Sequence, residues 1–166
     1  MVAQEATIDA AHFRHVLGHY PTGVCIITAR SAEGELFGMA VGSFTSVSLS
    51  PALVGFFPDN GSTSWPRIRA CGSFCVNVIG SHQLSLCRQF AARGGNKFEG
   101  VTHRLSPAGH PILDDCVMWI DCALHDEVAT GDHRLVLGRV AALEVERADQ
   151  PLLFLRGAYG AFQPLS

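Results

Sequence analysis

Apolar residues recur at helical spacing in three short stretches of the chain. Residues 8–17 place apolar side chains on one face and are followed by Gly18, a residue typical of a helix end. A second helix is expected within residues 62–72, where three successive hydroxyl side chains can cap its start. A third is expected within residues 81–94, where apolar residues again recur at helical spacing before a pair of glycines.

The rest of the chain has the pattern of short strands, in which apolar and β-branched runs are separated by turn residues. The runs that predict strands are residues 23–29, 36–42, 44–49, 52–57, 74–79, 118–128, 134–146 and 152–155. Strands over most of the chain, with two or three short helices, favour a mainly β fold: a closed antiparallel barrel with helical inserts, since closure removes unpaired strand edges. Without an internal repeat or a linker, residues 1–166 are expected to form a single domain.

Composition and charge narrow the class of partner. The net charge of −3 and the sequence pI near 6.2 lack the basic character that nucleic acids and anionic membranes require. No apolar run approaches the roughly 18 residues of a membrane-spanning helix. The first residues are interrupted by charged side chains, unlike a signal peptide. We therefore expect a cytoplasmic protein that binds neither nucleic acid nor membrane.

The six cysteines mostly lie inside apolar runs, as in Val24-Cys25-Ile26 and Phe74-Cys75-Val76. Such cysteines are expected to be reduced and buried, and to act as small apolar side chains. The cysteines and histidines also lack the close spacing of a zinc site, so no metal site is expected.

Signatures of several common enzyme classes are absent. The sequence contains no GxGxxG, GxxxxGK[ST], HExxH or GxSxG motif, which disfavours Rossmann dehydrogenases, P-loop enzymes and α/β hydrolases. The eight histidines have no spacing that pairs them with an acid. Composition alone therefore nominates no catalytic acid or base.

Glycine and hydroxyl residues are dense at residues 38–48 and again at residues 61–65. Glycine lets a flat ring or a phosphate approach the backbone closely, and backbone N–H groups and hydroxyls near Ser62 can bind an anion. A nucleotide cradle explains this pattern, and ordinary strand alternation followed by a capped helix explains it equally well.

Seven weak motifs in a fixed order carry a resemblance to a known family. They lie at residues 13–24, 38–51, 62–65 (Ser-Thr-Ser-Trp), 74–78 (Phe-Cys-Val-Asn-Val), 97–98 (Lys-Phe), 131–133 (Gly-Asp-His) and 152–159. With them the chain resembles, over residues 13–159, the short-chain flavin reductases, which have the FMN-binding split-barrel fold and serve as reductase components of two-component flavin monooxygenases. The segments at 64–65 and 74–77 are similar to reductases that serve aromatic-ring or natural-product hydroxylases, which commonly favour FAD.

The resemblance implies a flavin site built from two segments. Residues implied to line the isoalloxazine, mainly through backbone groups, are Gly38, Met39, Ala40, Val41, Gly42 and Ser43. Residues implied to hold the ribityl and phosphate portion are Phe57, Pro58, Asp59, Ser62, Thr63 and Ser64. The family often has a hydroxyl or an amide where Ala40 and Gly42 stand, so the flavin ring would depend on main-chain donors here.

Three further residues are implied at the edges of that site: Gln89 and Phe90 toward the adenine side or the second subunit, and Lys97 near the phosphate. The nicotinamide cofactor is implied to meet His133, Phe154, Leu155, Arg156, Gly157 and Tyr159. Each assignment has a simpler rival, because Phe90 and Phe154 suit a core and Lys97 suits a solvated surface.

The function implied is an NADH:flavin oxidoreductase, a homodimer that passes reduced FAD to a separate monooxygenase. FMN and NADPH are the alternative flavin and nicotinamide. Direct hydride transfer needs no general base, so His133 is expected to position the nicotinamide. One rival is a non-catalytic flavin-binding split-barrel protein. A second is a split-barrel oxidase of a pyridoxal-type substrate, which would need a basic phosphate cluster that the sequence lacks.

Overall fold

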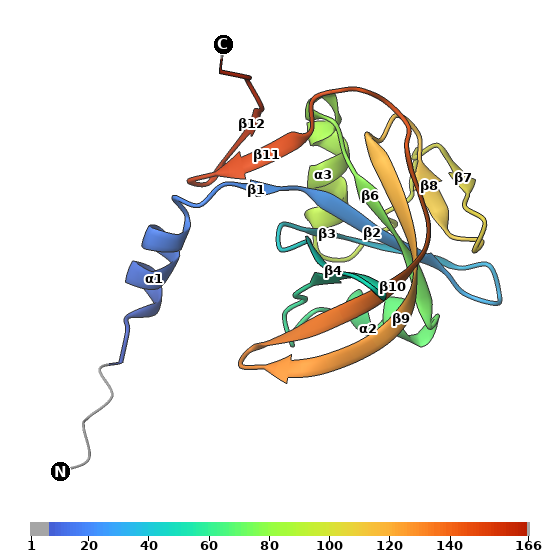
Figure 1. The fold of residues 1–166 in the computed structure, drawn as a ribbon, viewed down its shortest axis with the longest axis horizontal. Helices are drawn as coiled ribbons and strands as arrows, with labels where there is room; N and C mark the ends of the chain where they lie inside the picture. The colour runs from blue at the N-terminus through green and yellow to red at the C-terminus, as the bar shows by residue number, and fades with distance from the viewer. Residues whose placement is uncertain (1–6, 166) are drawn as a thin grey trace.

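The computed structural model describes residues 7–165, which form three α-helices, one 3-10 turn and twelve strands (Figure 1). The helical segments are α1 (Ala10–Leu17), α2 (Trp65–Ala70), η1 (Ser81–Gln83) and α3 (Leu84–Ala91). The strands are β1 (Thr22–Gly23), β2 (Cys25–Arg30), β3 (Leu36–Val41), β4 (Thr45–Leu49), β5 (Ala52–Phe56), β6 (Ser73–Val78), β7 (His103–Leu105), β8 (Pro111–Leu113), β9 (Met118–Thr130), β10 (His133–Val145), β11 (Leu152–Leu155) and β12 (Ala158–Ala161).

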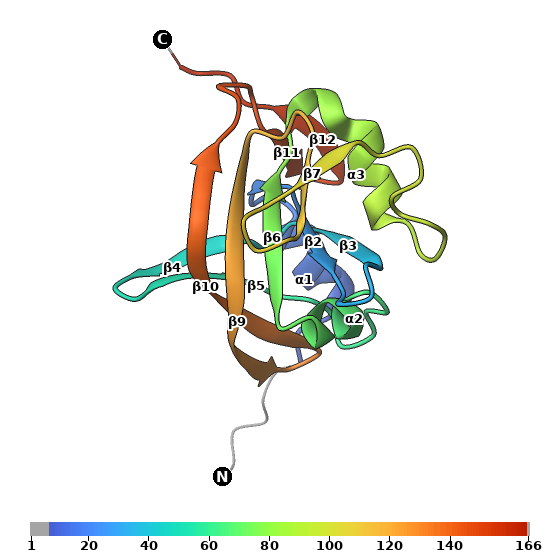
Figure 2. The ribbon, with the colours of Figure 1, turned by 90° about the vertical axis from the view of Figure 1, so that its right-hand side faces the viewer.

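Seven strands form one curved antiparallel sheet in the order β3-β2-β6-β9-β10-β5-β4. Its longest part is the hairpin of β9 and β10, two strands of 13 residues each that bend together (Figure 2). Register shifts near Gly138 and between Val140 and Ala142 mark irregular pairing of the kind that bends strands. A Cβ at Gly138 would lie 2.8 Å from the Phe74 ring, so the bare backbone there lets the hairpin pack closely on the core.

The sheet is not closed, which corrects the expectation of a closed barrel. Within residues 7–165, β3 pairs only with β2 and β4 only with β5, so the two end strands do not meet. Helices cover the core where strand pairing is missing: Trp65 and Ile68 of α2 are buried inside the curve, and α3 packs against β3. The fold is therefore mainly β with an open gap beside β3.

Strands β2 and β6 are buried on both faces, which explains their continuous apolar runs. In β2, Cys25, Ile27 and Ala29 join the main core inside the curve, where α2 also packs. On the opposite face, Ile26 packs with Phe90 of α3 in a second core. Two-sided burial removes the alternation of apolar and polar residues that marks a strand with one solvated face.

Two polar side chains inside the sheet attach the small hairpin of β7 and β8. The Thr28 hydroxyl donates to the carbonyl of Pro111 at 2.6 Å, and the Asn77 amide donates to the Thr28 hydroxyl at 3.0 Å. The Asn77 carbonyl oxygen in turn accepts from the backbone N–H of Leu113 at 2.9 Å. These polar groups form hydrogen bonds with one another. The bonds offset the free-energy cost of removing the groups from water.

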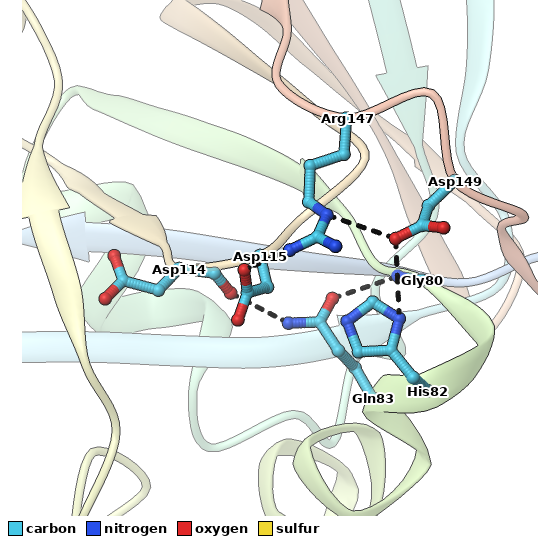
Figure 3. Close-up of polar contacts among 7 residues, drawn as sticks. All are labelled: Gly80, His82, Gln83, Asp114, Asp115, Arg147 and Asp149. Atoms are coloured by element: carbon cyan, nitrogen blue, oxygen red, sulfur yellow. Dashed lines mark hydrogen bonds and ion pairs between the residues drawn. The ribbon is translucent and has the colours of Figure 1, made fainter.

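A polar cluster attaches the connection between β10 and β11 to the rest of the fold (Figure 3). Arg147 donates to Asp149 at 3.1 Å and to Asp115 at 2.5 Å, while the Gln83 amide donates to the carbonyl of Asp114 at 2.9 Å. These contacts join three segments that are distant in the sequence. The connection leads into β11, which pairs with β1 on one side and with β12 on the other.

The expected helices and long strands are confirmed, with boundaries shifted by a few residues. The sequence did not predict β7, β8 or β12, which have three or four residues each. The expected strand at residues 23–29 is divided into β1, which pairs with β11, and β2, which joins the large sheet.

Candidate functional site

The gap beside β3 contains a cavity of about 420 Å³. The family resemblance implied all ten of its lining residues, which come from segments that are distant along the chain. The lining residues are Met39, Ala40, Val41, Gly42, Ser43, Phe57, Pro58, Asp59, Ser62 and His133. The structure thus brings His133 into the same cavity as both predicted flavin segments.

Backbone bonds explain how a residue of β10 reaches this cavity. Asp59 and His133 form an isolated antiparallel bridge, and the Arg134 N–H donates to the carbonyl of Pro58 at 3.0 Å. Beyond the bridge, the Asn60 N–H donates to the carbonyl of Asp132 at 2.9 Å. The loop after β5 therefore continues the pairing of the sheet up to the β9–β10 turn.

Ser43 holds the beginning of the loop that follows β5. Its hydroxyl accepts from the backbone N–H of Phe57 at 2.9 Å, which links the end of β3 to the end of β5 across the gap. The Asp59 carboxylate accepts from the Gly61 N–H at 2.6 Å and shapes the turn toward α2. Two side chains that the sequence implied as flavin ligands therefore also hold the cavity wall in place.

The imidazole of His133 is oriented by its neighbour in the chain. Its Nδ1 lies 2.7 Å from Oδ1 of Asp132, and the imidazole is 43% exposed. The hydrogen bond from His133 and the electrostatic attraction of that ring hold the pKa of Asp132 below its usual value. The ring is thus held at the rim of the cavity, where a ligand can contact it.

A second cavity of about 430 Å³ continues the first along β3 and shares Met39, Ala40, Asp59 and Ser62 with it. Its far part is lined by Thr63 and Ser64 on one side and by the end of α3 with Lys97 on the other. The Ser62 hydroxyl accepts from the Trp65 N–H at 3.1 Å, which confirms its expected capping role. Ser64 makes no side-chain capping bond.

Phe90 and Gly38 form a close contact on the outer face of β3. The Phe90 side chain is 1% exposed, and a Cβ at Gly38 would lie 2.3 Å from its ring. Glycine is therefore required at position 38 by packing, whatever ligand binds nearby. Phe90 belongs to the second core and also lines the second cavity.

Gln89 and Lys97 hold the loop that follows α3. The Gln89 amide donates to the carbonyls of Lys97 and Glu99 at 3.0 and 2.9 Å. The Lys97 ammonium donates to the carbonyls of Phe90 and Ala92 at 2.7 and 2.6 Å, close to the end of the helix. Partial burial lowers the pKa of Lys97. Lys97 lines the second cavity, whereas Gln89 does not.

The late motif lies beside a different, smaller cavity of about 230 Å³. Phe154 and Tyr159 line it, their rings 5.1 Å apart and edge to face, together with Ala40, Val41 and Gly42 of the β3 region. The Cys87 sulfur and the Tyr159 hydroxyl oxygen lie 3.7 Å apart, and the hydrogen bond with Cys87, together with partial burial, raises the pKa of the phenol.

A backbone hydrogen bond attaches the turn between β11 and β12 to the end of α1. The Arg156 N–H donates to the carbonyl of Gly18, and Arg156 has a positive φ of 51°. None of Leu155, Arg156 and Gly157 is among the residues that line these cavities. The 155–157 turn and His133 therefore do not line a common cavity within residues 7–165.

Sequence reasoning missed a further cavity of about 570 Å³, which contains Phe37 and Arg67. It continues the second cavity along β3, and we call the continuous space the groove. Arg67 lies one helical turn after Ser64, and this spacing was the signal that could have identified it. The guanidinium of Arg67 lies 5.9 Å from the centre of the Phe37 ring.

Three further observations on residues 7–165 concern the cysteines, metal ligation and membrane-spanning helices. All six cysteines are free and five are buried, as expected, and burial raises the pKa of Cys25 to about 12. Within residues 7–165, no group of three or more His, Cys, Asp or Glu side chains is placed to hold a metal ion. No helix in the same range is long and apolar enough to cross a membrane.

A family model described as a flavin reductase like domain matches residues 17–163. The chain belongs to the flavin reductase family. It is 54% identical over 157 residues to a flavin reductase of Pseudomonas putida, which spans 95% of this chain and 92% of that protein. The family and the enzyme class that the motifs implied are thereby confirmed.

Solved structures of related flavin reductases share the fold. Nitrilotriacetate monooxygenase component B of Mycobacterium thermoresistibile matches with a TM-score of 0.89 and 44% identity, over 93% of this chain and 87% of that chain. The NADH:FAD oxidoreductase SgcE6 of Streptomyces globisporus, solved with NAD and FAD fragments, matches with a TM-score of 0.88 and 33% identity, over 96% of this chain and 98% of that chain. The reductase thus resembles a component of a monooxygenase and an NADH:FAD oxidoreductase.

Proposed function

We propose that this reductase transfers a hydride from NADH to FAD, and that a separate monooxygenase receives the reduced flavin. The observation that carries the proposal is the cavity where the free edge of β3 faces Ser62 and His133. Within the described residues β3 pairs only with β2, so backbone N–H and C=O groups on its other edge are available to a ligand.

The residues present suit a flavin. Met39, Ala40 and Phe57 offer apolar surface for a flat ring, and the free edge of β3 offers the main-chain donors that replace the missing side chains at Ala40 and Gly42. In the second cavity, the hydroxyls of Thr63 and Ser64 and the ammonium of Lys97 suit a phosphate.

Shape and orientation are the main contributions expected from the protein. A bound flavin accepts the hydride of the nicotinamide at its N5 atom, so no side chain has to remove a proton in this step. The walls of the cavity would hold the two rings about 3 to 3.5 Å apart. His133, oriented by Asp132, stands at the rim where the nicotinamide would enter.

We further propose a homodimer. Helix α1 has no buried residue, and its apolar side chains Phe13, Val16 and Leu17 are about half exposed. An apolar helix face that stays exposed is typical of an interface. Figure 1 supports this proposal, because α1 extends away from the barrel.

The cysteines support a cytoplasmic location. Six thiols without a single disulfide are typical of a reducing compartment. The proposal is thus a cytoplasmic dimer that exchanges flavin with its partner monooxygenase.

Consumption of NADH with and without added flavin tests the proposed activity. We expect NADH oxidation only when FAD or FMN is supplied, because the chain holds no other redox centre among the residues described. Assays with NADPH and with each flavin establish the preferred pair. Equal NADH consumption without flavin, or none with either flavin, would overturn the proposal. The second result would favour a flavin-binding protein without turnover.

A further inference from the structure

The turn between β9 and β10 brings His133 to the rim of the cavity, but the neighbouring strands do not support this turn. Within residues 7–165, β5 pairs with β10 only from Val136 to Arg139, and β6 pairs with β9 only from Met118 to Ala123. The end of the hairpin therefore projects beyond both neighbours. A two-stranded ribbon is only marginally stable in water. The position of His133 thus depends on what else holds the turn.

One residue of the loop after β5, Asn60, holds both residues of that turn. Its backbone N–H donates to the carbonyl of Asp132 at 2.9 Å, and its side-chain amide donates to the carbonyl of Gly131 at 3.2 Å. Asn60 thereby extends the pairing that begins at the bridge between Asp59 and His133 up to the tip of the hairpin. The two carbonyls that it binds belong to the residues directly before His133.

We propose that Asn60 is a positioning residue for the nicotinamide, and that it acts through His133. The inference rests on the proposed function, because it assumes that His133 contacts the nicotinamide at the rim. Asn60 itself lines neither the cavity that contains His133 nor the two cavities that continue it along β3. It lines a separate cavity of about 200 Å³ together with Trp65 and Glu127. Its side chain is therefore expected to affect the nicotinamide through the turn and not by direct contact.

The loop that carries Asn60 is held by bonds that do not involve the Asn60 side chain. At its start the Phe57 N–H donates to the Ser43 hydroxyl at 2.9 Å, and further on the Asp59 carboxylate accepts from the Gly61 N–H at 2.6 Å. Loss of the Asn60 amide therefore leaves this wall of the cavity in place and frees only the turn. Because hydride transfer requires a separation of about 3 to 3.5 Å between the reacting atoms, a small movement of a positioning group lowers the rate.

Anaerobic stopped-flow reduction at saturating flavin, over a range of NADH concentrations, tests this role. Asn60→Ala should lower the second-order rate constant for reduction by NADH about three- to tenfold, as expected for the loss of one ordinary hydrogen bond. The Kd for flavin, measured by titration, should change by less than about twofold, because the wall keeps its own bonds. Asn60→Asp keeps the shape of the side chain but loses the donor, so it should resemble Asn60→Ala. Wild-type behaviour of Asn60→Asp would overturn the inference, because shape alone would then suffice.

A double-mutant cycle with His133 separates positioning from a merely structural role. If Asn60 acts through His133, Asn60→Ala should lower the rate constant by less than a further factor of about two when His133 is already alanine. Gln150→Ala is the matched control, since it removes an exposed amide from the connection between β10 and β11. It leaves the backbone bond from the Ser81 N–H to the Gln150 carbonyl intact, and it should behave as wild type.

Three further results would overturn the inference. An unchanged NADH dependence in Asn60→Ala would show that the amide does not position the turn. Additive effects of Asn60→Ala and His133→Ala, or normal reduction by His133→Ala itself, would show that Asn60 does not act through His133. A higher Kd for flavin with a normal NADH dependence would assign Asn60 to the flavin wall. In each case flavin-dependent NADH oxidation by wild type would still stand, whereas its absence with either flavin would overturn the proposed function.

Discussion

At the residue scale, His133 and Ser62 line one cavity, and Ser64 lines the second cavity that continues it. His133 stands at the rim beside Asp132, whereas Ser62 and Ser64 line the floor toward Lys97. Ser62 also caps α2, so its replacement affects the wall of the cavity as well as any ligand. These positions predict that substitutions at the two ends have different kinetic effects.

Replacing His133 by alanine should lower kcat/KM for NADH by about ten- to a hundredfold, because each 1.4 kcal/mol of lost positioning energy is about a factor of ten. The Kd for flavin should change little. Ser62→Ala combined with Ser64→Ala should instead raise the Kd for flavin, with the hydride step preserved at saturating flavin.

Stopped-flow reduction at saturating flavin, over a range of NADH concentrations, compares these variants. His125→Ala removes an exposed histidine of β9 and should behave as wild type. A normal rate of reduction in His133→Ala at every NADH concentration, together with weaker flavin binding, would show that His133 serves the flavin instead of the nicotinamide.

His110 makes stability depend on pH. It is 4% exposed, its Nδ1 accepts from the Arg30 N–H at 3.1 Å, and its Nε2 lies 2.7 Å from the Ser73 hydroxyl. Burial lowers the pKa of His110, although the charge of Asp121 opposes the shift. Below the unfolded pKa of about 6.5, the unfolded chain therefore binds more protons than the folded one, and stability falls as the pH falls.

Urea unfolding between about pH 5 and pH 7.5 measures this dependence. Wild type should lose stability as the pH falls below about 6.5, until the lowered pKa of the folded state is reached. His110→Gln should have a flatter pH profile than wild type, whereas His125→Gln should keep the wild-type slope. Parallel profiles for wild type and His110→Gln would refute this role of His110.

At the scale of elements, Glu127 of β9 anchors helix α2 beside the cavity. Its Oε1 accepts from the Trp65 indole at 2.9 Å and from Arg134, and its Oε2 lies 2.5 Å from Nε of Arg69 without hydrogen-bond alignment. Burial alone would raise the pKa of Glu127, but the bonds from Trp65 and Arg134 and the charge of Arg69 hold it below its usual value.

Glu127→Gln should lower the free energy of unfolding by about 1.5 kcal/mol. This free energy is at the low end of the range for a charged hydrogen bond. The reason is that Arg69 and Arg134, which contact Glu127, are partly exposed. Flavin binding should also weaken, since α2 follows Ser62 and Ser64 directly. Glu144→Gln, at an exposed position of β10, is the matched control. Equal denaturation midpoints for the two variants would contradict the anchoring role.

The individual helices and strands show which parts of the fold could be predicted from the sequence. Long periodic segments such as α3, β9 and β10 were predicted, because their own residues determine them. Strand β8 was not predicted, because its position depends on hydrogen bonds with Thr28 and Asn77, which lie in distant strands. The open gap was missed because nothing local indicates that α2 and α3, in place of a strand, cover the sheet beside β3. Arg67 enters the groove for the same long-range reason.

At the scale of the whole molecule, α1 buries none of its own residues and leaves its apolar side chains about half exposed. Sedimentation at micromolar concentration should show a homodimer. Val16→Asp combined with Leu17→Asp should shift it to monomer, since charged groups cannot be buried in an apolar interface without a large penalty. Leu105→Asp, at an exposed position of β7, should stay dimeric. A fully active wild-type monomer would contradict the proposed assembly.

The most direct test of hydride transfer in the β3 cavity is anaerobic stopped-flow mixing of the flavin-loaded reductase with NADH carrying deuterium at C4. Bleaching of the flavin absorbance should be rapid with ordinary NADH and clearly slower with the transferred deuterium, because the C–H bond breaks as the flavin is reduced. Ser62→Ala with Ser64→Ala, at saturating flavin, should retain both the rate and the isotope effect. Absence of bleaching, or bleaching equally fast with both forms of NADH in single turnovers limited by reduction, would contradict direct transfer.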